Sequence, residues 1–393
     1  MLRPPDDPAI CNNGSVTFPF SIASNAGAAR LGQINTAHGV VDTPAFMPVG
    51  TLGSVKAVPQ DVLEELDAQI ILGNTYHLYL RPGHELVRSL GGLHKFMSWN
   101  RSMLSDSGGF QVFSLSELRK VTEDGVTFRS HLDGSSHLFT PERSMEIQIA
   151  LGADIIMAFD ECTEFPAERS RSRSSMEMTL RWAKRSKEYF EAHKSEVLWH
   201  ETSGGRHQAL LGIVQGGMYA DLRRESAERT VELDFPAYAI GGLSVGEPRE
   251  KTMEMIAAAL EILPKDKPRY VMGVGYPDEI VRYAAMGVDM MDCVIPTRVA
   301  RHGLLLTSEG RMNIKNARYR HDQLPPDPKC GCKVCGRYTR AYLRHLFVSG
   351  EPLAGVLNTV HNLAFYLDTM RSLRHAIRLG DLSGLVSSYV SMA

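Results

Sequence analysis

Eight short apolar segments constrain the fold of this chain more than any other feature, because each ends in a polar or glycine-containing turn and is followed by a helix-like stretch. They are rich in β-branched residues and cover residues 44–49, 69–74, 103–106, 154–160, 209–215, 237–243, 269–275 and 288–294. Continuous apolar runs of this length suit parallel strands buried on both faces, and their alternation with helical stretches indicates βα units. Eight such units predict an α/β protein with a closed (β/α)8 barrel of the TIM type.

The composition is that of a soluble protein with one basic region. Hydrophobic residues make up 43% of the 393 residues, yet no segment approaches the roughly 18 uninterrupted apolar residues of a membrane span, and the N-terminus has no apolar stretch of signal-peptide length. We therefore expect a cytoplasmic protein with no membrane partner. The formal net charge is only −2, but residues 298–344 carry eleven Lys and Arg against three acidic residues, which predicts contact with a polyanion. The charge-rich segment 168–194 is interpreted as a solvated helix face rather than an RNA-binding arm.

Three of the six cysteines, Cys330, Cys332 and Cys335, lie within six residues of one another. A single turn can direct three thiolates at one tetrahedral ion, and zinc is the metal that this ligand set favours. The candidates for the fourth ligand are His345 and His361, of which we prefer His361, at the start of the following helical stretch. Four protein ligands close such a site, so the sequence predicts a structural metal rather than a catalytic one.

Two hairpins and a subdomain are expected to decorate the barrel. Residues 16–43 alternate like an antiparallel hairpin, and residues 128–139 turn on Asp133 and Gly134 as a second one. After Leu304 the barrel pattern gives way to a loop-rich segment that carries the cysteines. We expect an N-terminal extension and β-hairpin capping the barrel over residues 1–42, the barrel over 43–303, a zinc-binding subdomain inserted after strand eight over 304–363, and a C-terminal helical segment completing the barrel over 364–393.

Aspartates stand at the ends of the third, fourth and eighth predicted strands, at Asp106, Asp160 and Asp292. In such barrels the loops after the strands converge on one face, where reacting groups collect. One aspartate in this position is at least as often a helix N-cap, but three in one register indicate a site. The sequence has no HxH pair, no lysine at a strand end and no GxxxxGK[ST] loop, which argues against metal-dependent hydrolysis, Schiff-base chemistry and nucleotide hydrolysis. Carboxylates without a catalytic metal suit substitution at a glycosyl carbon.

Specific strings at the strand ends and around the cysteines resemble those of the tRNA-guanine transglycosylase family. They are TPAFMPVGT, ILGNTYHLYLRPG, LSDSGGFQVFSL, MAFDEC, RWAKRS, GIVQGG, AIGGLSVGE, MGVG, DCVIPTR, and the CxCxxC cluster with its distal VHN. The resemblance runs from about residue 18 to about residue 379, with the motifs in the family's order and spacing. It implies an irregular (β/α)8 barrel with a zinc-binding subdomain, and an enzyme that exchanges a base in tRNA.

The resemblance implies a separate role for each strand-end aspartate. Asp292 is expected to be the nucleophile that displaces guanine from the ribose at the wobble position and holds the tRNA covalently. Asp106 is expected to be the general acid/base that serves the departing and incoming bases, and Asp160 to recognise guanine. The other implied pocket residues are Gln215 and the backbone of Gly242 and Leu243 at the base's carbonyl oxygen, Phe110 and Met272 on the faces of the base, and Ser107, Cys162 and Val245, with packing an equal alternative for Cys162.

The resemblance also implies partners. Residues matched to RNA contacts are Arg298 and Arg301 after the nucleophile, with Lys315, Arg318 and Arg320 in the basic region, where positive charge neutralises phosphates. The family is typically homodimeric, and the matched interface residues are the ion pair of Lys56 and Glu351 and the aromatic cluster of Tyr338, Tyr342 and His345. For the zinc ion, the family pattern selects His361 over His345.

Residues near the pocket predict the bacterial branch of the family. The chain ends about 32 residues beyond His361, whereas the archaeal branch carries long C-terminal RNA-binding extensions. The eukaryotic branch has glycine where this chain has Val245, and valine fills the space that queuine needs. We therefore expect insertion of 7-aminomethyl-7-deazaguanine into tRNAs with a G-U-N anticodon, in queuosine biosynthesis. The alternatives are a queuine-inserting enzyme of eukaryotic type, a glycosidase that releases the base to water, and a non-catalytic RNA-binding paralogue, against which the presence of Asp292 and Asp106 argues.

Overall fold

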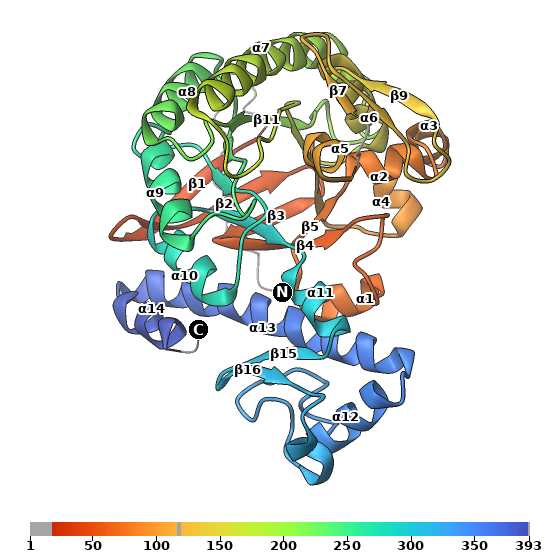
Figure 1. Ribbon diagram of the computed structural model, residues 1–393, viewed down its shortest axis with the longest axis vertical. Coiled ribbons are helices and arrows are strands. Elements are labelled where there is room, and N and C mark those ends of the chain that lie inside the picture. The colour runs from red at the N-terminus through yellow and green to blue at the C-terminus, as the bar shows by residue number, and fades with distance from the viewer. Residues whose placement is uncertain (1–17, 116–118, 392–393) are drawn as a thin grey trace, which may run out of the picture.

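The protein is built around a closed barrel of eight parallel strands (Figure 1). The computed structural model describes residues 18–115 and 119–391. The barrel strands are β4 (Ala45–Gly50), β5 (Ile70–Gly73), β6 (Ser102–Ser105), β10 (Ile155–Met157), β11 (Ala209–Val214), β12 (Tyr238–Ile240), β13 (Arg269–Val271) and β14 (Met290–Cys293), and β14 pairs with β4 to close the ring. Each of the eight predicted segments overlaps one of these strands, so the predicted (β/α)8 architecture is confirmed.

Helices follow the strands and cover the outside of the barrel. They are α1 (Gln60–Glu65), α2 (Thr75–Leu80), α3 (His84–Ser89), α4 (Gly92–Met97), α5 (Gly109–Leu115), α6 (Pro141–Leu151), α7 (Arg169–His193) with the 3-10 turn η1 (Lys194–Glu196), α8 (Ala220–Glu232), α9 (Arg249–Leu260), α10 (Pro277–Ala285) and α11 (Ile295–Arg301). Local signals start two of them. The Thr140 side chain accepts a hydrogen bond from the Arg143 N–H at the start of α6, and the Glu279 carboxylate accepts one from the Tyr276 N–H at the start of α10.

Two small antiparallel sheets lie outside the barrel. The predicted N-terminal hairpin is present as β1 (Phe20–Ala26) and β2 (Ala29–Thr36), and a further strand, β3 (Gly39–Thr43), extends it to three strands. The second predicted hairpin is β8 (Val126–Arg129) with β9 (Ser136–Phe139), and β7 (Arg119–Val121) extends it likewise. Residues 1–17 of the expected N-terminal extension lie outside the described residues.

A buried ion pair joins the N-terminal sheet to the barrel. The Arg30 guanidinium on β2 donates to both carboxylate oxygens of Asp289, with its Nε 3.0 Å from Oδ1. Asp289 lies just before β14 and also accepts the Arg269 N–H at 2.7 Å. Moving the sheet away would leave the buried Asp289 carboxylate without its partner, which is costly. The ion pair therefore holds the sheet in a fixed position on the barrel.

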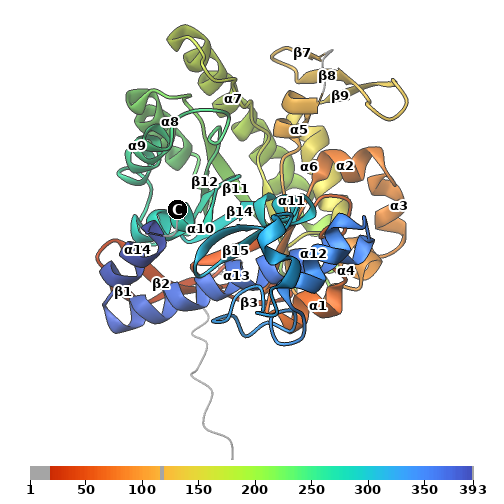
Figure 2. The same cartoon turned by 60° about the horizontal axis from the view of Figure 1, so that its bottom comes forward.

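The chain after β14 forms a small lobe and a long helix. The lobe contains β15 (Leu304–Thr307), β16 (Gly310–Asn313), the 3-10 turn η2 (Ala317–His321) and α12 (Arg340–Val348). The helix α13 (Pro352–Leu379) runs between this lobe and the barrel, and α14 (Ser383–Val390) follows it (Figures 1 and 2). The four-part division of the chain stays a prediction, and α13 is continuous across its boundary at residue 363.

The arginines of the charge-rich segment 168–194 form ion pairs on the surface. Segment 168–194 forms α7, whose arginines pair with acids of neighbouring elements, such as Arg181 with Glu123 and Arg169 with Asp221. No helix among the described residues is long and apolar enough to cross a membrane.

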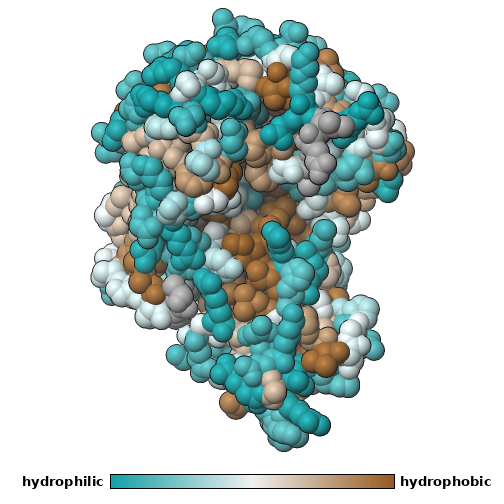
Figure 3. Space-filling model, viewed as in Figure 1, coloured by the Kyte–Doolittle hydropathy of each residue, from teal (hydrophilic) through white to brown (hydrophobic). Residues whose placement is uncertain are grey.

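The face in Figure 3 is hollowed near its middle, where apolar side chains line a recess between the barrel and the small lobe.

Candidate active site

The three predicted aspartates lie at the same end of the barrel: Asp106 and Asp160 follow β6 and β10, and Asp292 lies near the carboxyl end of β14. All three side chains are buried. They are close enough for the charge of Asp292 to raise the pKa of Asp106, and for the charge of Asp106 to raise the pKa of Asp160. A buried carboxylate needs hydrogen-bond donors, and here each obtains them largely from the ends of neighbouring strands. The structure therefore brings the predicted carboxylates together in one site.

Asp106 is held by the end of β5. Residues Gly73 and Ser105 pair across β5 and β6, so Asn74 and Asp106 follow side by side. The Asn74 amide donates to Asp106 Oδ2 at 2.5 Å, the Thr75 N–H donates to Oδ1 at 2.8 Å, and the Gln111 amide donates to Oδ2 at 2.9 Å. Burial still raises the pKa of Asp106 to about 6, with the charge of Asp292 adding to the rise. A carboxyl with this pKa can gain and lose a proton near neutrality.

Asp160 lies between the ends of β6 and β11. The Ser107 hydroxyl donates to its Oδ1 at 2.7 Å, and the Gln215 amide donates to its Oδ2 at 2.7 Å. Burial raises the pKa of Asp160 to about 6 as well, and the charges of Asp106 and Glu161 contribute. Each carboxylate oxygen keeps a second lone pair, so the group can accept two hydrogen bonds from one edge of a ligand.

Asp292 is oriented through one oxygen only. The Tyr270 hydroxyl donates to Oδ1 at 2.6 Å and the Gly273 N–H donates to Oδ1 at 2.8 Å, both from β13 or the turn after it. No donor among the described residues reaches Oδ2. Burial raises the pKa of Asp292 above its ordinary value. The free oxygen of a fixed, partly desolvated carboxylate is suited to nucleophilic attack.

The other residues predicted for the pocket follow the carboxyl ends of β6, β10, β11, β12 and β13. Gly242 has a φ of +63°, and a Cβ there would lie 2.3 Å from Gln215 Oε1, so only glycine lets this backbone approach Gln215 so closely. Met272 and Val245 are both half-buried, whereas Phe110, in the first turn of α5, is 49% exposed. An aromatic ring this exposed has an open face for a ligand. Cys162 is buried, and burial raises the pKa of its thiol to about 12, which favours packing over thiolate chemistry.

Sequence reasoning missed the groups that hold the aspartates. Asn74, Gln111 and Tyr270 make three of the contacts described above, and none had been singled out. Asn74 ends an apolar run as Asp106 does, so its position carried a signal. Tyr270 lies inside a strand, where nothing in the sequence distinguishes it from a core aromatic residue.

The predicted RNA-binding residues lie on the side of the chain after β14. Arg298 is exposed at the end of α11, while the Arg301 guanidinium donates to the Thr297 carbonyl oxygen at 2.8 Å. Lys315, Arg318 and Arg320 are exposed on and beside η2. Of the predicted interface residues, Lys56, Glu351 and His345 are exposed, and Tyr338 and Tyr342 stack with ring centroids 5.5 Å apart.

The three clustered cysteines and His361 form a group that could hold a metal ion. Their ligand atoms all lie within 4.8 Å of one another, and Nδ1 of His361 lies 3.2 Å from the Cys335 sulfur. The Nε2 of His361 is 2.9 Å from the Leu306 carbonyl oxygen, an arrangement that places the ring proton on Nε2 and leaves Nδ1 free for a metal. His345 is exposed on α12 and is not part of the group, so the structure places His361, and not His345, beside the cysteines.

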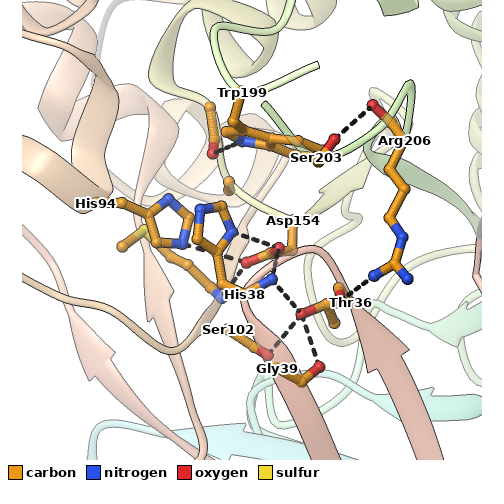
Figure 4. A network of polar contacts seen from close by, with 12 residues as sticks. Thr36, His38, Gly39, His94, Ser102, Asp154, Trp199, Ser203 and Arg206 are labelled. Atoms are coloured by element: carbon orange, nitrogen blue, oxygen red, sulfur yellow. Dashed lines mark hydrogen bonds and ion pairs between the residues drawn. The ribbon is translucent and has the colours of Figure 1, made fainter. Parts of the chain in front are cut away.

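A second group consists of His38, His94 and Asp154 (Figure 4). Asp154 directly precedes β10, so this group lies at the opposite end of the barrel from the aspartate site. His38 Nδ1 is 2.7 Å and His94 Nε2 is 3.2 Å from the Asp154 carboxylate, which also accepts the Met103 N–H at 2.9 Å. Burial alone would raise the pKa of Asp154, but the two imidazoles hold it below its ordinary value. The rings stack 3.6 Å apart at 13°, and two nearly parallel rings cannot both direct an in-plane lone pair at one ion. We interpret the group as a hydrogen-bonded anchor for the turn between β2 and β3.

Comparisons with known proteins agree with this arrangement. The family model described as queuine tRNA-ribosyltransferase matches residues 25–392. Relatives with that name are 68% identical over 369 residues in Koribacter versatilis (94% of this chain and 96% of the relative), 57% identical over 350 residues in Caldanaerobacter subterraneus subsp. tengcongensis (89% and 90%), and 56% identical over 354 residues in Solibacter usitatus (90% and 92%).

The metal group gives a first prediction. We expect the purified protein to hold about one metal ion per chain, and the Cys335→Ser variant to lose most of it and to unfold at a lower temperature, because metal binding links the cysteine loop to α13. Elemental analysis and thermal unfolding measure both effects. The matched control is His345→Ala, which should keep its metal; a Cys335→Ser variant with full metal content would refute the assignment.

Proposed function

The chain belongs to the queuine tRNA-ribosyltransferase family, and from this we propose that it replaces guanine at the wobble position of G-U-N anticodon tRNAs with 7-aminomethyl-7-deazaguanine. The observation that carries the proposal is the site of three buried aspartates in which one, Asp292, keeps an oxygen free of hydrogen bonds to the described residues. The reaction is a double displacement at C1′ of the ribose, with a covalent aspartyl-RNA intermediate.

In the first displacement, Asp292 Oδ2 forms a bond to C1′ while the bond from C1′ to N9 of guanine breaks. Asp106 donates its proton to the departing guanine. In the second, the incoming base gives its N9 proton back to Asp106 and bonds to C1′, and the ester to Asp292 breaks. Protons and bonds balance without a further reactant.

The charges of Asp106 and Asp292 support this division of roles. Asp292 raises the pKa of Asp106 while it is ionised, which favours a protonated Asp106 before attack. Once Asp292 becomes a neutral ester, that repulsion disappears. The carboxylate that Asp106 becomes on giving up its proton is then more stable. Each step therefore prepares the protonation state that the next step needs.

Recognition of the base is assigned to Asp160 and its neighbours. The Asp160 carboxylate would accept the ring N–H and the exocyclic amine of guanine. Gln215 uses one amide hydrogen on Asp160 and keeps the other for the base's carbonyl oxygen. The N–H groups of Gly242 and Leu243 have no acceptor among the described residues and would serve the same oxygen. Phe110 and Met272 would enclose the faces of the base, as is usual for a base flipped out of its stack.

We infer that zinc is the metal held by Cys330, Cys332, Cys335 and His361. Three thiolates and an imidazole are ligands that zinc prefers, and four protein ligands leave no open position for catalysis. The ion would join the cysteine loop to α13 and support the lobe that carries the basic residues.

For the macromolecular partners, we propose that tRNA binds across Arg298, Arg301, Lys315, Arg318 and Arg320. A homodimer would pair Lys56 with Glu351 across the interface, beside the stacked Tyr338 and Tyr342 and exposed His345. Among the described residues neither Lys56 nor Glu351 is in an ion pair, so both are free to form one.

The nucleophile can be tested directly. The Asp292→Asn variant should lose incorporation of labelled guanine into an anticodon stem-loop containing U-G-U, because an amide is a poor nucleophile. It should also lose the covalent RNA complex on a denaturing gel. Asp278→Asn, a buried acid on α10, is the control and should retain both. Full activity of Asp292→Asn would overturn the assignment, and free guanine released without incorporation would indicate a glycosidase instead.

Recognition by Asp160 predicts a pH dependence. The ionised carboxylate accepts both hydrogen bonds, so binding of guanine should weaken as pH falls through the pKa of about 6. Between pH 7 and pH 5 we expect the Kd of guanine to rise about tenfold, since the ionised fraction falls by about that factor. Calorimetry measures it, and the Asp106→Asn variant separates the titration of Asp160 from that of Asp106. A Kd that stays constant over this range in both proteins would contradict the role.

The choice of incoming base depends on Val245. Its side chain is half-buried beside the pocket, so the Val245→Gly variant should improve the use of queuine by opening space for the cyclopentenediol. Competition between queuine and 7-aminomethyl-7-deazaguanine for labelled RNA gives the ratio, and guanine exchange by the same variant is the internal control. An unchanged ratio would refute the steric explanation.

A further inference from the structure

Among the described residues, Arg223 on α8 is the one arginine whose side chain is fully buried and donates to the backbone of the proposed base pocket. Its relative exposure is 0%. The guanidinium donates four hydrogen bonds, all to backbone carbonyls at the ends of β11 and β12: Nε to Gly217 at 2.9 Å, Nη1 to Val214 at 3.0 Å and to Gly241 at 2.6 Å, and Nη2 to Gly242 at 3.1 Å. Among the described residues it forms no salt bridge. A buried charge without a carboxylate partner is costly, so the contact requires an explanation beyond packing.

Two of these carbonyls belong to the peptide units that present the proposed base-binding N–H groups. The carbonyl of Gly241 and the N–H of Gly242 form one planar unit, and the carbonyl of Gly242 and the N–H of Leu243 form the next. In a trans peptide the C=O and N–H bonds point in opposite directions. By holding both carbonyls, Arg223 directs both N–H groups away from itself. Neither N–H has an acceptor among the described residues, which is uncommon for backbone this buried and indicates that a ligand supplies one.

The local sequence explains why an outside group is needed to fix this turn. Gly241 and Gly242 have no side chains to hold them, and glycine backbone is the most conformationally permissive. A planar guanidinium has several donors in a rigid fork and can hold two adjacent carbonyls at once, whereas a lysine ammonium is a single point charge. Burial lowers the pKa of Arg223 to about 10, so the group remains charged at neutral pH.

The charge has a second effect. A cation on a peptide carbonyl polarises the whole unit, and hydrogen bonds in such a chain strengthen one another. The N–H groups of Gly242 and Leu243 are therefore stronger donors than ordinary amides. Guanine gains electron density on its carbonyl oxygen as it leaves C1′, and pre-oriented donors at such an oxygen lower the barrier.

We propose that Arg223 is a positioning residue that fixes and polarises the Gly242 and Leu243 N–H groups toward the carbonyl oxygen of the base, without touching the base itself. This inference rests on the proposed function, because that function places the carbonyl oxygen at these two donors. It predicts that a change at Arg223 weakens the binding of bases that have a carbonyl oxygen at this position more than the binding of bases that lack it.

The test compares guanine with 2-aminopurine, which lacks the carbonyl oxygen, in the wild type and in Arg223→Lys. We expect the variant to lower kcat/KM for guanine and to weaken guanine binding by about tenfold or more, in line with the loss of oriented donors at an oxyanion. Binding of 2-aminopurine, measured by competition, should change less than about twofold. This base also lacks the ring N–H that Asp160 would accept, but that loss is the same in both proteins, so the double difference isolates the contact with the oxygen. Equal weakening of both ligands would overturn the proposal.

Two control variants distinguish positioning from general stability. Arg224→Ala changes the neighbouring exposed arginine, which pairs with Glu261, and should leave both ligands unaffected. Arg269→Lys changes another buried arginine that donates to backbone carbonyls, those of Leu263 and Pro264, at the opposite end of the barrel. It should lower the unfolding temperature but leave the ratio of guanine to 2-aminopurine affinity unchanged. A matching change of that ratio in Arg269→Lys would also refute the proposal.

Two further measurements keep the outcomes separable. If Arg223→Lys does not fold, Arg223→Gln, which is neutral and retains an amide donor, takes its place, and the same ratio decides. Wild-type incorporation of labelled guanine tests the proposed function itself. Incorporation by the wild type with an unaltered ligand ratio in the Arg223 variants would reject the positioning role alone, whereas absence of wild-type incorporation would reject the proposed function on which it rests.

Discussion

The burial of three carboxylates at one end of the barrel is the constraint on which the rest of the site depends. Each needs donors, and each obtains them from neighbouring strands: Asp106 from the end of β5, Asp160 from β6 and β11, and Asp292 from β13. The register of the parallel strands therefore fixes the chemistry, because a shift of one residue would turn a donor or an acid out of the site. The same burial raises the pKa of all three acids above their ordinary values.

The barrel needs support outside itself to keep this register. At the end opposite the site, Asp289 and Asp154 accept hydrogen bonds from the N-terminal sheet through Arg30 and His38. On the side of the small lobe, α13 binds the barrel through the Arg374 guanidinium, which donates to the Pro44 carbonyl oxygen at 2.9 Å. The same helix carries His361, so the metal group and the first barrel strand are joined by a single rigid element. A metal ion held by this group would therefore link the small lobe to the barrel through α13.

Much of this could be predicted from the sequence, and what could not has a common physical cause. Apolar runs, strand-end aspartates and clustered cysteines are local patterns, and the eight strands, the acid site and the Cys-Cys-Cys-His group followed from them. The third strands β3 and β7 were missed because short strands are decided by pairing rather than by periodicity. Tyr270 and Arg223 were missed because their roles depend on groups distant in sequence: Asp292 lies 22 residues from Tyr270, and the Gly242 carbonyl lies 19 residues from Arg223.

The contrast between Arg223 and the aspartates explains how one barrel end can serve both recognition and reaction. Asp106 and Asp292 change charge during the proposed cycle, so their surroundings must tolerate both the ionised and the neutral state, and their hydrogen bonds come from neutral donors such as Tyr270 and the Asn74 amide. The donors at the base's carbonyl oxygen must instead remain constant, and a guanidinium that stays charged at neutral pH provides that constancy from behind the peptide plane. Direct contact of a cation with the base would attract the carboxylates as well and would oppose the proton transfers of Asp106. Separating the charge from the ligand by one peptide unit retains its polarising effect and leaves the acids free to titrate.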